Sequence, residues 1–116
     1  MVAAMKRLAL SALLLLSSSQ AWAGASNFVL VNGTGVSLAD LSIARSGTHD
    51  WKSLGAAPAA GARAPLSFSN PDCAFDIRAN VNGAGPVTWA GVNLCDVKSV
   101  ILKRDATAGA WVDYDQ

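Results

Sequence analysis

Few residues of this 116-residue chain belong to types that perform catalysis or bind a transition metal. The single histidine, His49, stands beside Asp50 in a predicted turn. A serine–histidine–aspartate site needs three groups that converge in space with an oxyanion hole, which adjacent turn residues do not provide. One histidine also argues against a zinc or copper site of the usual type. We therefore expect no catalytic residues, no enzymatic activity and no resident cofactor.

The two cysteines begin and end a predicted β-hairpin. Apolar and polar residues alternate over Cys73–Val81, a turn signal follows at Asn82–Pro86, and Val87–Cys95 runs back. In a regular hairpin the two cysteines are opposed at its open end, with Cα atoms about 4.5–5.5 Å apart, within disulfide range. An exported chain meets an oxidising compartment, so we expect a structural disulfide between Cys73 and Cys95.

A regular hairpin folded about Ala84 also predicts which other residues are opposed. Large side chains then lie opposite small ones, which fills one face of the sheet without overpacking. The predicted pairs are Val81 with Val87, Ala79 with Trp89, and Ile77 with Gly91.

The same register places Asp72 opposite Asp96, just outside the disulfide. Opposed like charges are unfavourable. Lys98 or Arg78 could neutralise them, the carboxylates could splay into water, or a cation could lie between them. Calcium needs six or more oxygen ligands, of which Asp72 and Asp96 supply a beginning. A calcium- or small-ligand-binding domain centred on these two residues is therefore the alternative hypothesis for function.

A candidate binding surface follows from the same alternation. Asp76, Arg78 and Asn80 point away from the predicted core, and Trp51 follows a turn. Exposed indoles can stack on sugar rings or anchor a partner protein. Alternatively, Trp51 and Trp111 close the ends of the core.

The elements that must position these residues are short β-runs separated by Gly, Pro, Asn and Asp. A phase slip at Ala39-Asp40 indicates a bulge, and Leu54–Ala64 is predicted to be a loop or a short irregular helix. The pattern predicts a small antiparallel β-sandwich of about seven strands with one disulfide. The expected strands are Asn27–Asn32, Val36–Ser46, Leu66–Ser69, Cys73–Val81, Val87–Cys95, Val97–Lys103 and Ala110–Tyr114.

Residues 1–23 have the three parts of a secretory signal peptide. Lys6 and Arg7 precede the apolar run Leu8–Leu16, and Ala21-Trp22-Ala23 supplies small residues at a cleavage site. The apolar run is about half of the roughly 20 residues that a membrane-spanning helix requires, although a retained N-terminal anchor is the alternative. We expect cleavage after Ala23, a single domain over residues 24–116 without a membrane anchor, and a periplasmic or secreted location.

Charge excludes one class of partner. Removal of Lys6 and Arg7 leaves seven of the nine basic residues beside eight acidic ones, all Asp, for a net charge of −1. Because no basic stripe remains to neutralise phosphates, we expect no nucleic-acid binding.

Several phrases of the chain together resemble a family of small exported bacterial proteins of unknown function. They are Phe28–Gly35 (Phe-x-Leu-x-Asn-x-Thr-Gly), Trp51–Gly55, Cys73–Arg78 (Cys-x-x-Asp-x-Arg) and Gly91–Cys95. The chain departs from the family pattern at Ala74 and in the Ala-rich Ala56–Ala64 stretch. The resemblance implies a β-sandwich, export and a paired-cysteine hairpin, and it brings no activity. We therefore expect an exported binding or structural module whose partner is an envelope or extracellular protein or a glycan.

Overall fold

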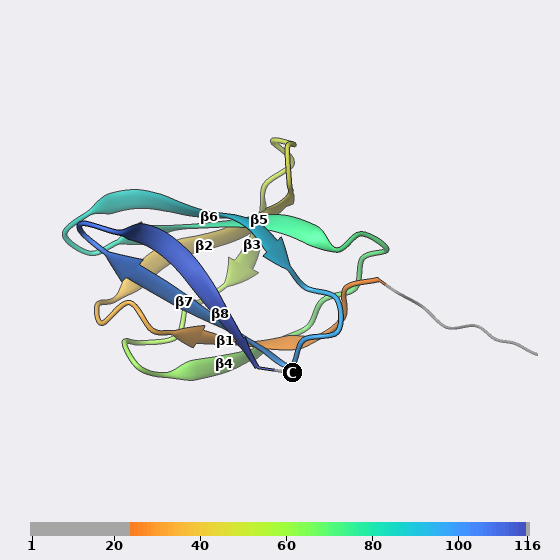
Figure 1. Ribbon diagram of the computed structural model, residues 1–116, viewed down its shortest axis with the longest axis horizontal. Helices are drawn as coiled ribbons and strands as arrows, with labels where there is room; N and C mark the ends of the chain where they lie inside the picture. Colours follow the sequence, from red (N-terminus) through yellow and green to blue (C-terminus); the bar gives the residue numbers. More distant parts are fainter. Residues whose placement is uncertain (1–23, 116) are drawn as a thin grey trace, which may run out of the picture.

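The computed structural model of the chain describes residues 24–115 as two four-stranded β-sheets that pack together as a sandwich (Figure 1). Within these residues there is no helix long and apolar enough to cross a membrane. The predicted signal peptide lies outside the described residues. The strands are β1 (Phe28–Asn32), β2 (Leu38–Arg45), β3 (Lys52–Gly55), β4 (Arg63–Leu66), β5 (Ala74–Val81), β6 (Gly85–Asn93), β7 (Ser99–Asp105) and β8 (Gly109–Asp115).

The strand orders are β4-β1-β7-β8 in one sheet and β3-β2-β5-β6 in the other. All neighbouring strands are antiparallel except β1 and β7, which are parallel. The predicted β-sandwich is confirmed, with eight strands in place of about seven. The extra strand arises because β3 and β4 form at the borders of the stretch predicted to be irregular, and the strand expected at Leu66–Ser69 ends at Leu66.

Alternation on β5 builds the centre of the core. Phe75, Ile77, Ala79 and Val81 are buried on one face of the strand. Opposite them, Trp89 is 1% exposed, and its indole Nε1–H donates to the Lys103 carbonyl oxygen in the other sheet at 2.8 Å. Trp89 thus lies on the core face of the hairpin, and its hydrogen bond ties the two sheets together.

A buried asparagine organises the end of β1. Asn32 is fully buried, and its Nδ2 donates to the carbonyl oxygens of Val36 and Pro58 at 2.8 and 3.1 Å. Its Oδ1 accepts hydrogen bonds from the backbone N–H and the hydroxyl of Thr34. The adjacent Gly33 has no room for a side chain, because a Cβ would lie 2.9 Å from the Leu102 carbonyl oxygen. The Asn-x-Thr pattern therefore has a structural role here.

The predicted register of the β5–β6 hairpin is wrong near the turn. Val81 pairs with Gly85, Ala79 with Val87 and Ile77 with Trp89, so the hairpin folds about Gly83. The register then shifts between Phe75 and Ile77, where β6 contains one more residue than β5. This β-bulge includes Gly91, whose φ of 65° suits glycine.

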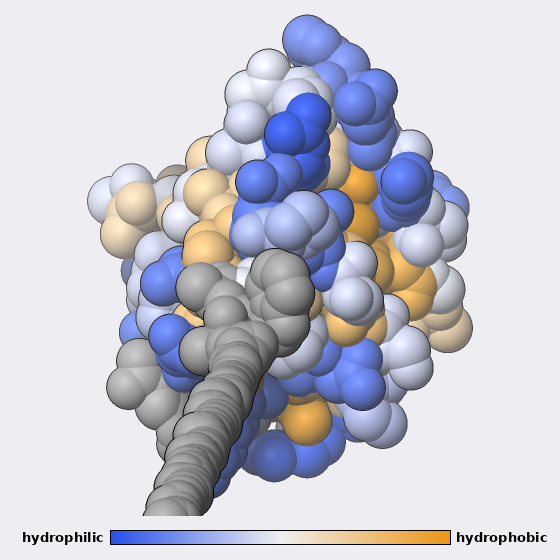
Figure 2. Space-filling model, turned by 90° about the vertical axis from the view of Figure 1, so that its right-hand side faces the viewer, coloured by the Kyte–Doolittle hydropathy of each residue, from blue (hydrophilic) through white to orange (hydrophobic). Residues whose placement is uncertain are grey.

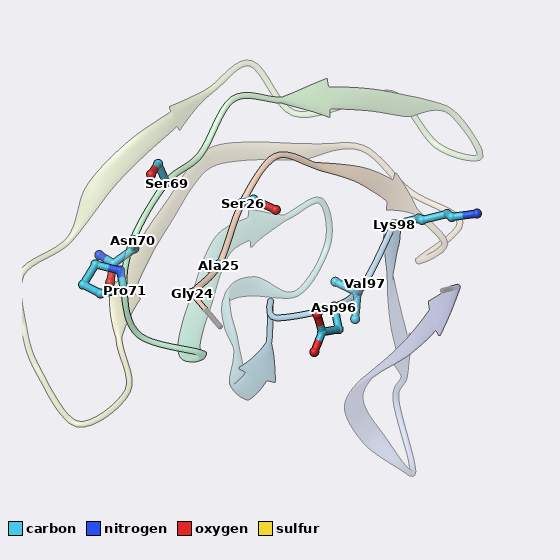
Figure 3. A pocket seen from close by; sticks show the side chains of 9 residues that line it. All are labelled: Gly24, Ala25, Ser26, Ser69, Asn70, Pro71, Asp96, Val97 and Lys98. Carbon is cyan, nitrogen blue, oxygen red and sulfur yellow. The ribbon is translucent and has the colours of Figure 1, made fainter. Parts of the chain in front are cut away.

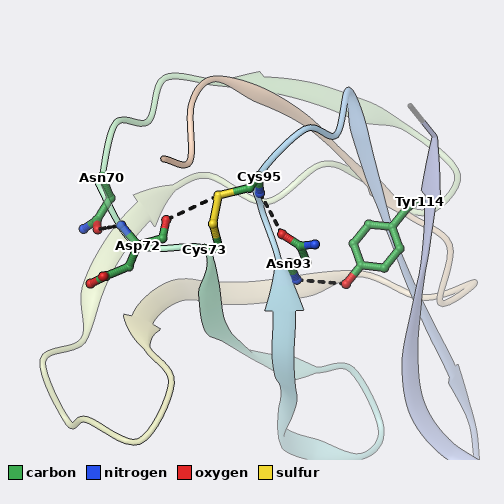
Figure 4. The surroundings of a disulfide bond; sticks show 6 residues. All are labelled: Asn70, Asp72, Cys73, Asn93, Cys95 and Tyr114. Carbon is green, nitrogen blue, oxygen red and sulfur yellow. Dashed lines mark hydrogen bonds between the residues drawn. A yellow bond between two sulfur atoms is a disulfide. The ribbon is translucent and has the colours of Figure 1, made fainter. Parts of the chain in front are cut away.

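The Cys73–Cys95 disulfide is confirmed, with a Cα–Cα distance of 5.2 Å (Figure 4). Beyond the β6 bulge, Phe75 pairs with Val92 and Ala74 with Asn93, which brings the ends of the two strands closer to the predicted register. The Leu94 N–H then donates to the Cys73 carbonyl oxygen, next to the disulfide. A disulfide in a small β-domain is consistent with an oxidising compartment.

Candidate functional site

The predicted binding residues lie on the outer face of the β3-β2-β5-β6 sheet. Because Phe75, Ile77 and Ala79 point into the core, the alternating Asp76, Arg78 and Asn80 point outward. Trp51 immediately precedes β3, which pairs with β2, and β2 pairs with β5.

The strongest contact on this face joins Trp51 to Arg78. The guanidinium carbon of Arg78 lies 3.9 Å from the centroid of the Trp51 ring, a cation–π geometry. Both side chains are half-buried. The sequence alone does not predict this contact, because it depends on the strand order, in which β2 lies between β3 and β5.

The loop between β2 and β3 carries Trp51 to this position and projects beyond the sheet (Figure 1). Thr48 anchors the loop, since its N–H and its hydroxyl both donate to the Arg45 carbonyl oxygen, at 3.0 and 2.9 Å. The Trp51 N–H then donates to the His49 carbonyl oxygen at 2.9 Å. His49 itself is exposed in this loop.

A second contact on the same face involves the predicted bulge of β2. The register of β2 against β5 shifts between Ala39 and Ser42, which confirms the bulge. Asp40 adopts a φ of 54° there, a left-handed conformation that aspartate tolerates better than most residues. Its Oδ2 accepts a hydrogen bond of 2.8 Å from Asn80 Nδ2. The bulge thus presents a carboxylate beside Asn80.

These groups surround an open hollow of about 520 Å³. The Trp51 indole borders this hollow together with residues that carry hydroxyl, amide and charged groups. The polar and aromatic residues of its lining include Asp40, Ser42, Trp51, Ser53, Arg78 and Asn80. Across the strands, Ser53, Ser42, Arg78 and Thr88 are successive register partners and so form one polar row.

The charged residues of the hollow differ in whether the described chain gives them a hydrogen-bond or ion-pair partner. Lys52 and Arg78 line it together with Asp40. Within residues 24–115 neither cation has an ion pair, and Arg78 donates no hydrogen bond there. Asp40, in contrast, is held by Asn80. The hollow therefore offers guanidinium donors to an external acceptor.

Asp76 shares the outer face but does not line the hollow. Its Oδ1 accepts hydrogen bonds from the Ser46 hydroxyl and from the Gly91 N–H, both at 2.9 Å. The second bond satisfies a backbone donor in the β6 bulge, which the ladder leaves unpaired. The structure thus gives this predicted binding residue a role in the sheet.

Asp72 and Asp96 lie outside the β5–β6 ladder, so the ladder does not oppose them as predicted. The β5–β6 ladder ends at Ala74 and Asn93, and Asp72 forms an ion pair with Arg45 at 3.1 Å. The neutralising cation is therefore Arg45, where Lys98 or Arg78 was expected. Asp96 adopts a φ of 61° beyond the end of β6.

Asp96 borders a separate hollow at the end of the sandwich where the described chain begins. The Gly24–Ala25 segment runs between Asn70 on one side and Asp96 on the other (Figure 3), and the Ala25 N–H donates to the carbonyl oxygens of Asn70 and Asp72. Figure 2 looks onto this end and shows apolar residues scattered among hydrophilic ones. Among residues 24–115 no group of three or more His, Cys, Asp or Glu side chains could hold a metal ion.

The remaining surface aromatic residues lie on β8. Trp111 and Tyr114 are 41% and 40% exposed. The Tyr114 hydroxyl oxygen accepts a hydrogen bond from the Asn93 N–H of β6 at 2.9 Å (Figure 4), so this ring joins the edges of the two sheets. Trp111 therefore does not close an end of the core.

Comparison with protein-family models, curated proteins and solved structures yields no match to this chain. Its class is defined by its own fold, a small disulfide-bonded β-sandwich.

Proposed function

We propose that the chain is an exported, non-enzymatic binding module of the periplasm or the secreted space. Its binding surface is the outer face of the β3-β2-β5-β6 sheet around Trp51 and Arg78. The observation that carries this proposal is the Arg78 guanidinium, which lies on Trp51 in an open hollow and has no carboxylate partner among the described residues.

Pre-organisation supports binding over a purely structural role. Stacking on Trp51 restricts the guanidinium before a ligand arrives, which lowers the entropy lost on binding. The neighbouring Asp40 is likewise held by Asn80. A surface with fixed donors, fixed acceptors and an indole has the features of a recognition site.

Export is supported by the N-terminal pattern and by the Cys73–Cys95 disulfide, which persists in oxidising compartments. The calcium hypothesis for Asp72 and Asp96 receives no support from their surroundings, because Arg45 already compensates the charge of Asp72.

The test is retention of the purified chain, residues 24–116, on a bacterial cell-envelope preparation. We expect Trp51→Ala and Arg78→Ala each to weaken retention at least about tenfold, equivalent to about 1.4 kcal/mol. Trp111→Ala is the matched control, because it removes an exposed indole from the other sheet. Thermal unfolding of each variant verifies that it is folded.

Equal retention of the two hollow variants and the original chain would contradict the proposal. So would a loss confined to Trp111→Ala.

A further inference from the structure

We propose that the Trp51–Arg78 hollow binds a sugar ring that carries a carboxylate, as found in acidic saccharides. This inference rests on the proposed binding function and names the chemical class of its ligand. The class follows from the arrangement of charge, hydroxyl groups and the indole on one sheet face.

The carboxylate is inferred from Arg78. A guanidinium presents planar, paired N–H donors that match the two oxygens of a carboxylate. Here the group is held 3.9 Å from the Trp51 centroid and makes no hydrogen bond or ion pair within residues 24–115. No group of the described chain accepts a hydrogen bond in the plane of the guanidinium that contacts the indole ring, so its N–H donors stay available to a ligand.

The positive charge that an anionic ligand would meet in the hollow is that of Arg78. Lys52 is the register partner of the buried Ile43. Alternation therefore turns its side chain to the opposite face from Trp51 and Ser53. Asp40 repels an anionic group, because its hydrogen bond from the neutral Asn80 amide leaves its charge in place. A bound carboxylate is therefore expected at Arg78, with the hydroxyl groups of the ring toward Asp40 and Asn80.

The sugar ring is inferred from the remaining groups. Ser42 is the register partner of Arg78, and Ser53 is the partner of Ser42. Asp40, in the β2 bulge, accepts a hydrogen bond from Asn80. These groups donate hydrogen bonds to hydroxyls and accept hydrogen bonds from them. The half-buried Trp51, one ring face of which is covered by Arg78, adds apolar surface beside them. Trp and Arg are common at the centres of protein–protein interfaces, whereas Ser and Asp are depleted there. The hydroxyl, amide and carboxylate groups around Arg78 are therefore what favours a saccharide over a protein partner.

The test is isothermal titration calorimetry of the folded chain, residues 24–116, with three trisaccharide probes. Trigalacturonate carries carboxylates, galactotriose is neutral, and a sulfated galactotriose is anionic without a planar acid. We expect trigalacturonate to bind at least about tenfold more tightly than either of the others.

Arg78→Lys is the informative variant, because it retains the charge and loses the planar fork. We expect it to weaken trigalacturonate binding at least about fivefold and to leave the melting temperature nearly unchanged. Arg63→Lys, a matched change at an exposed arginine of the other sheet, should bind trigalacturonate like the original chain.

Two outcomes would overturn this inference alone. They are equal affinities for the three probes, and absence of trigalacturonate binding while envelope retention still depends on Trp51 and Arg78. Loss of both trigalacturonate binding and that dependence would overturn the proposed function as well. Full trigalacturonate affinity in Arg78→Lys would overturn the assignment of the carboxylate to the guanidinium.

Discussion

Two arginines of the same sheet differ in the neighbour that holds them, and only one of them is proposed to bind a ligand. Arg45 reaches Asp72 at 3.1 Å, and both side chains are about half exposed. Such a pair contributes at most about 1 kcal/mol, and it already compensates the charge of Arg45 with a carboxylate of the chain. Arg78 contacts an indole instead, so it is positioned while its hydrogen-bonding capacity is kept.

At the same scale, Asn32 should be the most sensitive polar residue of the domain. Asn32→Ala removes the donor to the Val36 and Pro58 carbonyl oxygens and the acceptor for Thr34. Because these groups would be left unsatisfied near the core, we expect a loss of about 2–4 kcal/mol of unfolding free energy, measured by urea denaturation.

Asn82→Ala is the control for that measurement, because Asn82 is exposed in the β5–β6 turn. It should change the unfolding free energy by less than about 0.5 kcal/mol. Equal effects of the two substitutions would show that the buried hydrogen bonds of Asn32 do not stabilise the fold.

At the scale of elements, the β6 bulge depends on Asp76. We expect Asp76→Ala to lower the unfolding free energy by about 1–3 kcal/mol, because the Gly91 N–H and the Ser46 hydroxyl lose their acceptor. Urea denaturation measures this loss. The folded variant should still bind trigalacturonate, since Asp76 does not line the hollow.

Asp76→Asn separates charge from hydrogen bonding, because an amide oxygen can still accept both bonds. The unfolding free energy of Asp76→Asn should therefore lie closer to that of the original chain than the unfolding free energy of Asp76→Ala does. A stable Asp76→Ala that loses trigalacturonate binding would instead make Asp76 a binding residue.

Some elements of the fold could be predicted from sequence patterns, and others could not. The alternation over β5 predicted both its buried face and its outward residues, because a half-buried strand must alternate. The register of β6 was beyond prediction, because the bulge is stabilised by a side chain from the other strand and depends on Gly91. The strands β3 (Lys-Ser-Leu-Gly) and β4 (Arg-Ala-Pro-Leu) are four residues long and contain no β-branched or aromatic residue. Pairing with a neighbouring strand, and not local preference, therefore makes them strands.

The candidate site was predicted only in part for the same reason. Arg78 and Asn80 were placed on one face by alternation, and the bulge at Asp40 was visible as a phase slip. That Asp40 meets Asn80, and that Trp51 meets Arg78, follows from the order β3-β2-β5, which nothing in the local sequence specifies.

At the scale of the whole molecule, the disulfide should supply much of the stability. A domain of this size buries a limited core and is marginally stable. Closing a loop across a sequence separation of 22 stabilises by roughly 3 kcal/mol in the chain-entropy model. We expect the double variant Cys73→Ser/Cys95→Ser to lose about 2–4 kcal/mol in urea denaturation. A change below about 1 kcal/mol would indicate that the sheets hold this end together without the covalent bond.

The two outer faces of the sandwich are predicted to differ in function, and one titration compares them within a single molecule. The experiment is a two-dimensional NMR titration with trigalacturonate. The indole N–H of Trp111 reports on the other sheet, while the indole N–H of Trp51 and the Nε–H of Arg78 report on the hollow. We predict saturable shifts of the Trp51 indole and Arg78 Nε–H signals with no shift at Trp111. Shifts at Trp111 without shifts at Trp51 and Arg78, or no saturable shift at any of them, would contradict the assignment of this sheet face as the binding surface for an acidic saccharide.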